Sequence, residues 1–194
     1  MEERNMTLHK NLNNMYQAEL AMLVSLFLVL IPFANIVAAF VVLIAAIVSV
    51  VALVGLRNVH KDYYSAIGML VLGVVLGLFG QGDGTTAFLF ATGSSIAELI
   101  QSYLIIRATN SLLAELETEQ EKTIRRGKLV WKLYLLNALV GFATGLIPAG
   151  DNLMLLWGIL VITLILGVVA AAFNVIYLKA GSEAFRDSIP PETV

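Results

Sequence analysis

The chain contains no cysteine and few charged residues. Of its 194 residues only 13% are Asp, Glu, Lys or Arg, and four are proline. The lack of cysteine excludes disulfides, thiolate metal ligands and cysteine nucleophiles. Soluble domains carry roughly 25% charged residues, and a net charge of −2 without a long basic run gives no indication of a nucleic-acid partner.

Long apolar segments take the place of those charges. Apolar residues make up 59% of the chain, and a helix needs about 20 of them to cross the hydrocarbon core of a bilayer. Six segments qualify: 17–32, 36–56, 62–80, 86–107, 128–147 and 152–179. The sequence therefore predicts an all-α, polytopic membrane bundle with about six transmembrane helices, forming a single transmembrane domain over residues 1–194.

The distribution of charge predicts the orientation. All twelve Lys and Arg residues fall in 4–10, 57–61, 107–132 and 179–186, on one side of the predicted bundle. The turns on the other side hold only Asp83 and Asp151 as charged residues, and Pro32 lies in the first turn, where it divides the apolar run 20–56 into two helices. Because cytoplasmic loops are enriched in Lys and Arg, we expect a multi-pass protein of the cell membrane with both termini in the cytoplasm.

Two polar segments flank the predicted spans. Residues 8–19 trace one helical face, which predicts either a short interfacial helix or an extension of the first span. Residues 108–127 are predicted to continue the fourth helix into the cytoplasm, with Glu121 and Arg125 at the stabilising i,i+4 spacing and Gly127 ending or bending the helix. This charged connector is either a solvated link or a docking handle for a partner.

Three similar segments indicate an internal repeat. They read SLFLVLIP at 25–32, GVVLGLFG at 73–80 and GFATGLIP at 141–148. We therefore predict three helical hairpins in the same orientation, spanning 17–56, 62–107 and 128–179. Small residues let helices approach closely in lipid, so we expect either packing inside the bundle or a homo-oligomer interface at five of them: Ser25, Gly73, Gly77, Gly141 and Gly145.

One long segment carries a resemblance. LIPFANIVAAFVVLIAAIVSVVALVGLRNVHKDYYSA combines an LIP turn, a long aliphatic helix and a basic, aromatic end. It resembles small uncharacterised membrane proteins of bacteria and archaea that carry such a segment once or twice. The resemblance covers residues 20–68 well and 139–186 loosely, and it implies no activity and no site residues.

Glu98 is the candidate for a functional residue within the membrane, because intramembrane ionisable groups are costly and tend to be functional. Ser94 and Gln101 share its helical face, which should turn towards the bundle interior, and Asn137 lies at a similar depth. These residues form either an ion, proton or substrate site or a structural hydrogen-bonded cluster. Glu19 is expected to reach the membrane interface. Neither histidine has a second metal ligand at a useful spacing, so no metal or cofactor is expected.

No motif of an enzyme is present: there is no Gly-x-Ser-x-Gly, no His-Glu-x-x-His and no phosphate-binding glycine loop. We therefore do not expect an enzyme. Two hypotheses remain open. The first is a small transporter or channel with its polar site around Glu98. The second is a non-catalytic scaffold or accessory subunit that binds a membrane-protein partner through helix faces and the connector.

Overall fold

The computed structural model describes residues 1–28, 31, 34–81, 84–116, 120–145 and 153–190. These residues form six helices and no strands: α1 (Glu2–Leu28), α2 (Ala34–Gly55), α3 (Lys61–Phe79), α4 (Thr85–Leu113), α5 (Glu121–Gly145) and α6 (Leu153–Asp187). The all-helical prediction is thus confirmed. Pro32, Asp83, Pro148 and Asp151 lie outside the described residues.

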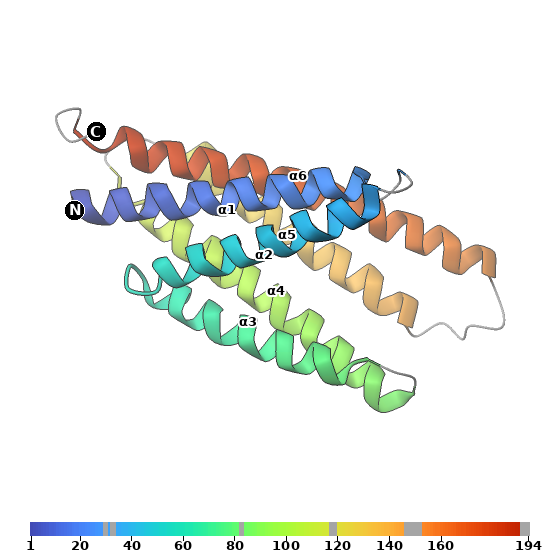
Figure 1. Cartoon of the computed structure of the whole chain (residues 1–194). Helices are drawn as coiled ribbons and strands as arrows, with labels where there is room; N and C mark the ends of the chain where they lie inside the picture. The colour runs from blue at the N-terminus through green and yellow to red at the C-terminus, as the bar shows by residue number, and fades with distance from the viewer. Residues whose placement is uncertain (29–30, 32–33, 82–83, 117–119, 146–152, 191–194) are drawn as a thin grey trace.

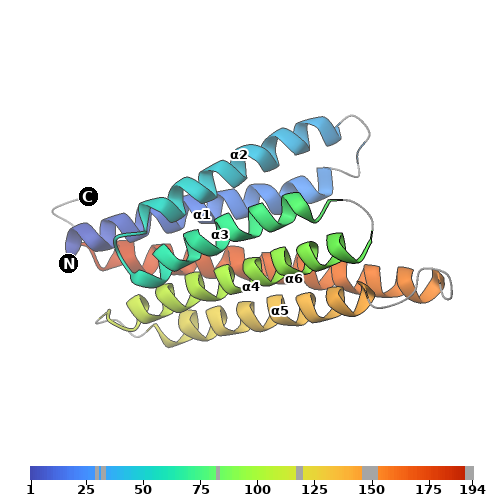
Figure 2. The ribbon, with the colours of Figure 1, turned by 90° about the horizontal axis from the view of Figure 1, so that it is seen from below.

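The helices run back and forth along a common axis, and both termini lie at the same end, which we call the terminal end (Figures 1 and 2). The opposite end is called the far end. Helix α1 packs extensively against both α2 and α6, α5 packs against α6, and α3 packs against α4. Contact between α4 and α5 is less extensive, and α2 meets α3 only slightly.

Four of the described helices, α2, α3, α4 and α6, are long and apolar enough to cross a membrane. The other two, α1 and α5, begin with polar turns at Glu2 and Glu121 and have shorter apolar parts within the described residues. Large apolar side chains on the outside of the far half are exposed, including Phe40, Leu78 and Trp157. This surface suits contact with lipid rather than with water.

Three expectations about the terminal end need correction or refinement. Residues 8–19 belong to α1, so they continue the first predicted helix instead of forming a separate one. Helix α4 ends at Leu113, and Glu121 starts α5, so the expectation that the fourth helix carries Glu121 and Arg125 was wrong. Helix α6 continues to Asp187 instead of ending near 179.

Gly127 lies inside α5 instead of ending a helix, and it is buried. A Cβ atom at this position would stand 2.7 Å from Tyr177 Cε2 on α6 and 2.8 Å from Asn110 Oδ1 on α4. The residue is therefore needed for the close approach of three helices. Its local helix-weakening effect is outweighed by this packing.

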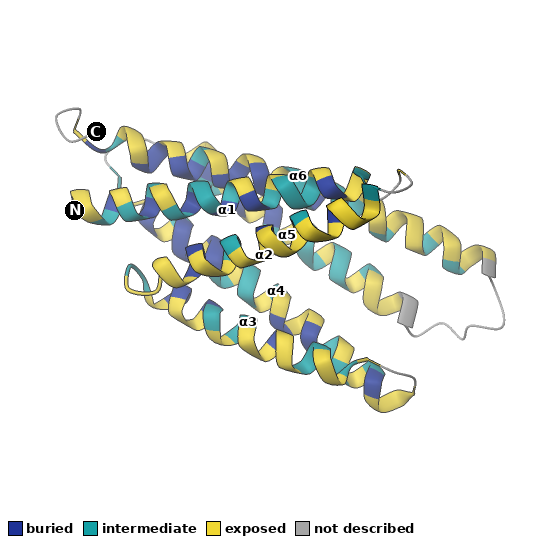
Figure 3. Cartoon of the chain, viewed as in Figure 1, coloured by how far each residue is buried: buried dark blue, intermediate teal, exposed yellow. Residues whose placement is uncertain are grey.

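The main hydrophobic core occupies the terminal end (Figure 3). Its fully buried members include Leu8, Leu12, Tyr63, Tyr177 and Phe185, which come from α1, α3 and α6. The two buried hydroxyl groups have partners: Tyr63 Oη lies 2.8 Å from Thr109 Oγ1, and Tyr177 Oη donates to Asn110 Oδ1 at 3.0 Å. The hydroxyl group of each tyrosine thus has the hydrogen-bond partner that a buried polar group needs.

Candidate functional site

The polar side chains on the Glu98 face of α4 point in different directions. Ser94 is buried against α3, where its hydroxyl donates to the Gly73 carbonyl oxygen at 2.8 Å. A Cβ on Gly77 would stand 3.3 Å from the same hydroxyl, so small residues on α3 make room for Ser94. Ser94 also lies 3.4 Å from Glu98 Oε1, which links the α3 contact to the acid.

Glu98 lies on an open groove rather than in the closed interior that the sequence predicts. The groove has a volume of about 750 Å³ and is lined by α4, α5 and the Thr163 side of α6. Glu98 and Ser95 are exposed along it. The expected interior orientation fails for Glu98 because α4 and α5 pack less closely than the neighbouring helix pairs, which leaves this face of α4 uncovered.

Asn137 lines the same groove, so the structure brings Glu98 and Asn137 to one surface. Asn137 Oδ1 is buried and has no hydrogen-bond partner among the described residues. Gly141 lies one turn further along α5 and also lines the groove, and no atom of the described part of the chain lies within 4 Å of where its Cβ would stand. Gly141 therefore makes no close helix contact, in contrast to Gly73 and the buried Ser25. No side-chain environment is described for Gly145.

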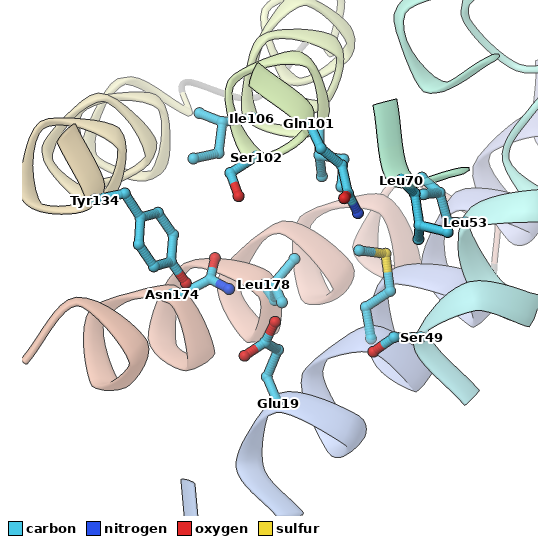
Figure 4. A pocket seen from close by; sticks show the side chains of 12 residues that line it. Glu19, Ser49, Leu53, Leu70, Gln101, Ser102, Ile106, Tyr134, Asn174 and Leu178 are labelled. Atoms are coloured by element: carbon cyan, nitrogen blue, oxygen red, sulfur yellow. The ribbon is translucent and has the colours of Figure 1, made fainter. Parts of the chain in front are cut away.

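A second, interior cavity of about 100 Å³ lies closer to the terminal end. All six helices contribute side chains to it (Figure 4). Its polar lining consists of Glu19, Ser49, Gln101, Ser102, Tyr134 and Asn174. Gln101 points into this cavity, so it is separated from Glu98, its predicted neighbour in one site.

Three of these side chains form a polar cluster. The Asn174 amide lies within hydrogen-bonding reach of both the Glu19 carboxyl group and the Tyr134 hydroxyl, and Figure 4 shows the three side chains converging from α6, α1 and α5. Ser49 Oγ is buried and has no hydrogen-bond partner among the described residues. An unpaired buried hydroxyl is typical of a site that holds a water molecule or another ligand.

This cluster was not predicted from the sequence. Glu19 was expected to reach the membrane interface, whereas its side chain turns inward to Asn174. Helix α1 begins at Glu2, so Glu19 lies well inside the helix and not near its start. A usable signal was present, since Glu19, Tyr134 and Asn174 each lie inside an apolar segment near its predicted terminal-side boundary.

The groove and the interior cavity share two lining residues. Ser102 and Tyr134 line both, so these two side chains lie between the groove and the cavity. Both residues carry hydroxyl groups. Polar side chains are therefore found on the groove beside Glu98, between the two hollows, and in the cavity beside Glu19.

Comparisons with protein-family models, with curated proteins and with solved structures found no match to this chain.

Proposed function

We propose that the chain is a small transporter or channel of the cell membrane, with its intramembrane polar site around Glu98. In this proposal all six helices cross the bilayer as three antiparallel hairpins, α1–α2, α3–α4 and α5–α6, and both termini are cytoplasmic. The positions of Lys and Arg at the terminal end support this orientation. The substrate class is a cation, a proton or a small solute.

The observation that carries the proposal is the series of polar side chains that line the groove, the cavity and the wall between them. An acid exposed to hydrocarbon alone would be costly, but Glu98 has Ser95, Asn137 and Thr163 beside it on the groove. Ser102 and Tyr134 continue this series between the groove and the cavity. A series of polar side chains of this kind is what a solute or ion needs to enter an otherwise apolar bundle.

Flux measurements test the role of Glu98. Purified protein is reconstituted into liposomes, and cation or proton flux is followed for the wild type, for Glu98→Gln and for Glu121→Gln. Glu121 is an exposed acid at the start of α5, far from the groove, so its variant controls for loss of charge. We expect Glu98→Gln to reduce flux towards that of protein-free liposomes. Equal flux in all three proteins would remove Glu98 from the mechanism.

The absence of cysteine allows a direct test of the topology. A single cysteine replaces either Asn58, exposed at the terminal end, or Gln81, exposed at the far end. A membrane-impermeant maleimide should label Gln81→Cys in intact cells and Asn58→Cys only after lysis. The reverse labelling would contradict the proposed orientation, and labelling of both in intact cells would contradict the spans.

The second candidate, a scaffold or accessory subunit, is favoured by one observation. Gly141 presents an uncovered helix surface on α5, and small residues of this kind let a second helix approach closely in lipid. Such a helix would come from a second copy or from a membrane-protein partner. The connector offers less, because Leu112 and Leu113 are buried in the core and Arg4 pairs with Glu115 at 2.9 Å.

Cross-linking separates the two candidates. Gly141→Cys should form a disulfide-linked dimer in membranes if a second copy occupies this surface, whereas Gly68→Cys, at an exposed glycine of α3, serves as the control. A partner that co-purifies in stoichiometric amount and is displaced by Gly141→Leu would favour the accessory subunit. A monomer that still conducts flux would favour the transporter.

A further inference from the structure

The interior cavity differs from the groove in size. Its volume of about 100 Å³ compares with about 750 Å³ for the groove. One water molecule takes up about 30 Å³ in the liquid, whereas sites for drug-sized organic ligands measure roughly 300–1,000 Å³. The interior cavity thus has room for an ion with a few waters, but not for an organic solute of that size.

The lining has the chemistry of a hard cation site. Its polar groups are the Glu19 carboxyl, the Asn174 and Gln101 amides, and the hydroxyls of Ser49, Ser102 and Tyr134. All of them can offer oxygen atoms, which are the ligands that alkali and alkaline-earth cations prefer. In the described part of the chain, no imidazole lines the cavity, and its one sulfur ligand is the thioether of Met15.

The net charge of the cavity lining decides between monovalent and divalent cations. Among the described residues, those that line the cavity include one acid and no base. A single carboxylate balances one positive charge, and a divalent ion would leave an uncompensated charge inside the bundle, which is expensive. One Glu19 carboxylate therefore matches a monovalent ion.

From these observations we infer that the cavity formed by Glu19, Ser49, Gln101, Tyr134 and Asn174 is a binding site for one monovalent hard cation, with Na⁺ as the representative ion. Glu19 supplies the charge, and Asn174 holds the carboxyl group in place from α6. Ser49 Oγ, which lacks a partner among the described residues, gains one in the bound ion. Because the ion contacts several helices at once, its binding should stabilise the whole bundle.

This inference goes beyond the proposed role of Glu98, and it is tested by the melting temperature of the protein instead of by flux. The melting temperature of the purified protein in detergent is measured in choline chloride alone. It is then measured in mixtures of choline chloride with NaCl, LiCl or KCl at the same ionic strength. Choline is too large for the cavity and keeps the screening constant. We expect Na⁺ to raise the melting temperature of the wild type in a saturable manner.

Matched variants identify the site. Glu19→Gln should abolish the Na⁺-dependent rise, whereas Glu98→Gln should retain it, although it loses flux. Ser49→Ala removes one hydroxyl and no charge, so it should fold and should need a several-fold higher Na⁺ concentration for the half-maximal rise. It also keeps the test informative if Glu19→Gln fails to fold.

Two results would overturn the inference. The first is a wild-type melting temperature that is the same in NaCl and in choline chloride, which would leave Glu19 as a structural hydrogen-bonding group. The second is a Na⁺-dependent rise that Ser49→Ala and Glu19→Gln both retain unchanged, which would place the ion elsewhere. Neither result depends on flux, so failure of this site and failure of the Glu98 proposal can be told apart.

Discussion

The two ends of the bundle are packed in different ways. At the terminal end, large side chains such as Leu12, Tyr177 and Phe185 are fully buried. In the far half the buried residues are small, for example Ser25, Ala38, Ala45, Gly73 and Ala87. The large side chains of that half face outward, and Figure 3 shows the far ends of the helices mostly exposed.

This difference in packing is what water around the terminal end and lipid around the far half would favour. In water, apolar side chains gain free energy by leaving the solvent, so a large core forms. In lipid that gain is missing, and helices associate through close contacts of small residues and hydrogen bonds. The terminal end is thus built like a soluble helical bundle, and the far half like a membrane bundle. The Glu19 cavity lies where the two kinds of packing meet.

A pair of leucines on α1 gives the largest expected effect. Leu12 is fully buried in the terminal core, and Leu26 is 46% exposed in the far half. Leu12→Ala should lower the free energy of unfolding by about 2–5 kcal/mol, because truncating a buried leucine leaves a cavity. Leu26→Ala should have much less effect, since lipid or detergent replaces the lost contact. Both are measured by unfolding in mixed detergent micelles, and equal losses would contradict the division into two kinds of packing.

Substitutions at two glycines on α5 should change the free energy of unfolding by an intermediate amount. A Cβ at Gly127 would overlap the Tyr177 ring and Asn110, whereas Gly141 has open space around it. Gly127→Ala should cost about 1–3 kcal/mol as an overpacked contact. Gly141→Ala should be neutral or stabilising by up to about 1 kcal/mol, because alanine favours a helix.

The oligomeric state of the purified protein serves as the control for the two glycine variants. If Gly141→Ala destabilised the protein as much as Gly127→Ala does, the surface at Gly141 would be covered by another helix in the purified protein. Size-exclusion chromatography of the same samples then shows whether a second copy provides that helix.

Much of the helical framework could be predicted from the sequence. The predicted span 36–56 corresponds to Ala34–Gly55, and 62–80 corresponds to Lys61–Phe79. The first segment is apolar almost throughout, the second is apolar after a polar first turn, and both end near turn residues, so composition largely defines them. The prediction was less successful at the terminal end, where α1 and α6 continue as polar helices beyond their apolar parts.

The candidate site was only partly predictable. Glu98 is conspicuous because it is an acid inside an apolar segment, and both Glu98 and Asn137 line one groove. Its exposure could not be predicted, since it depends on how far α4 and α5 separate. The position of Glu19 depends on the side-chain direction in α1 and on Asn174, which lies 155 residues away along the chain. Such a long-range pairing leaves no local pattern.

The smallest expected effect tests a single hydrogen bond in the terminal core. Tyr177 is fully buried, its ring packs against Gly127, and its hydroxyl donates to Asn110 Oδ1 at 3.0 Å. Tyr177→Phe keeps the ring and removes only the hydroxyl, so the lost bond should cost about 0.5–1.5 kcal/mol. Tyr64, which is 69% exposed on α3, provides the control, and Tyr64→Phe should leave the free energy of unfolding nearly unchanged.

A third phenylalanine variant makes this test sharper. Tyr63 pairs with Thr109, but Thr109 Oγ1 also donates to the Ile105 carbonyl oxygen at 2.9 Å and keeps that partner when the Tyr63 hydroxyl is removed. Because an acceptor left unsatisfied in a buried place accounts for much of the cost, Tyr63→Phe should cost less than Tyr177→Phe. The same unfolding measurement ranks the three variants. If Tyr177→Phe proved as harmless as Tyr64→Phe, water would reach Asn110, and the terminal end would not be the closed core that its buried aromatic residues indicate.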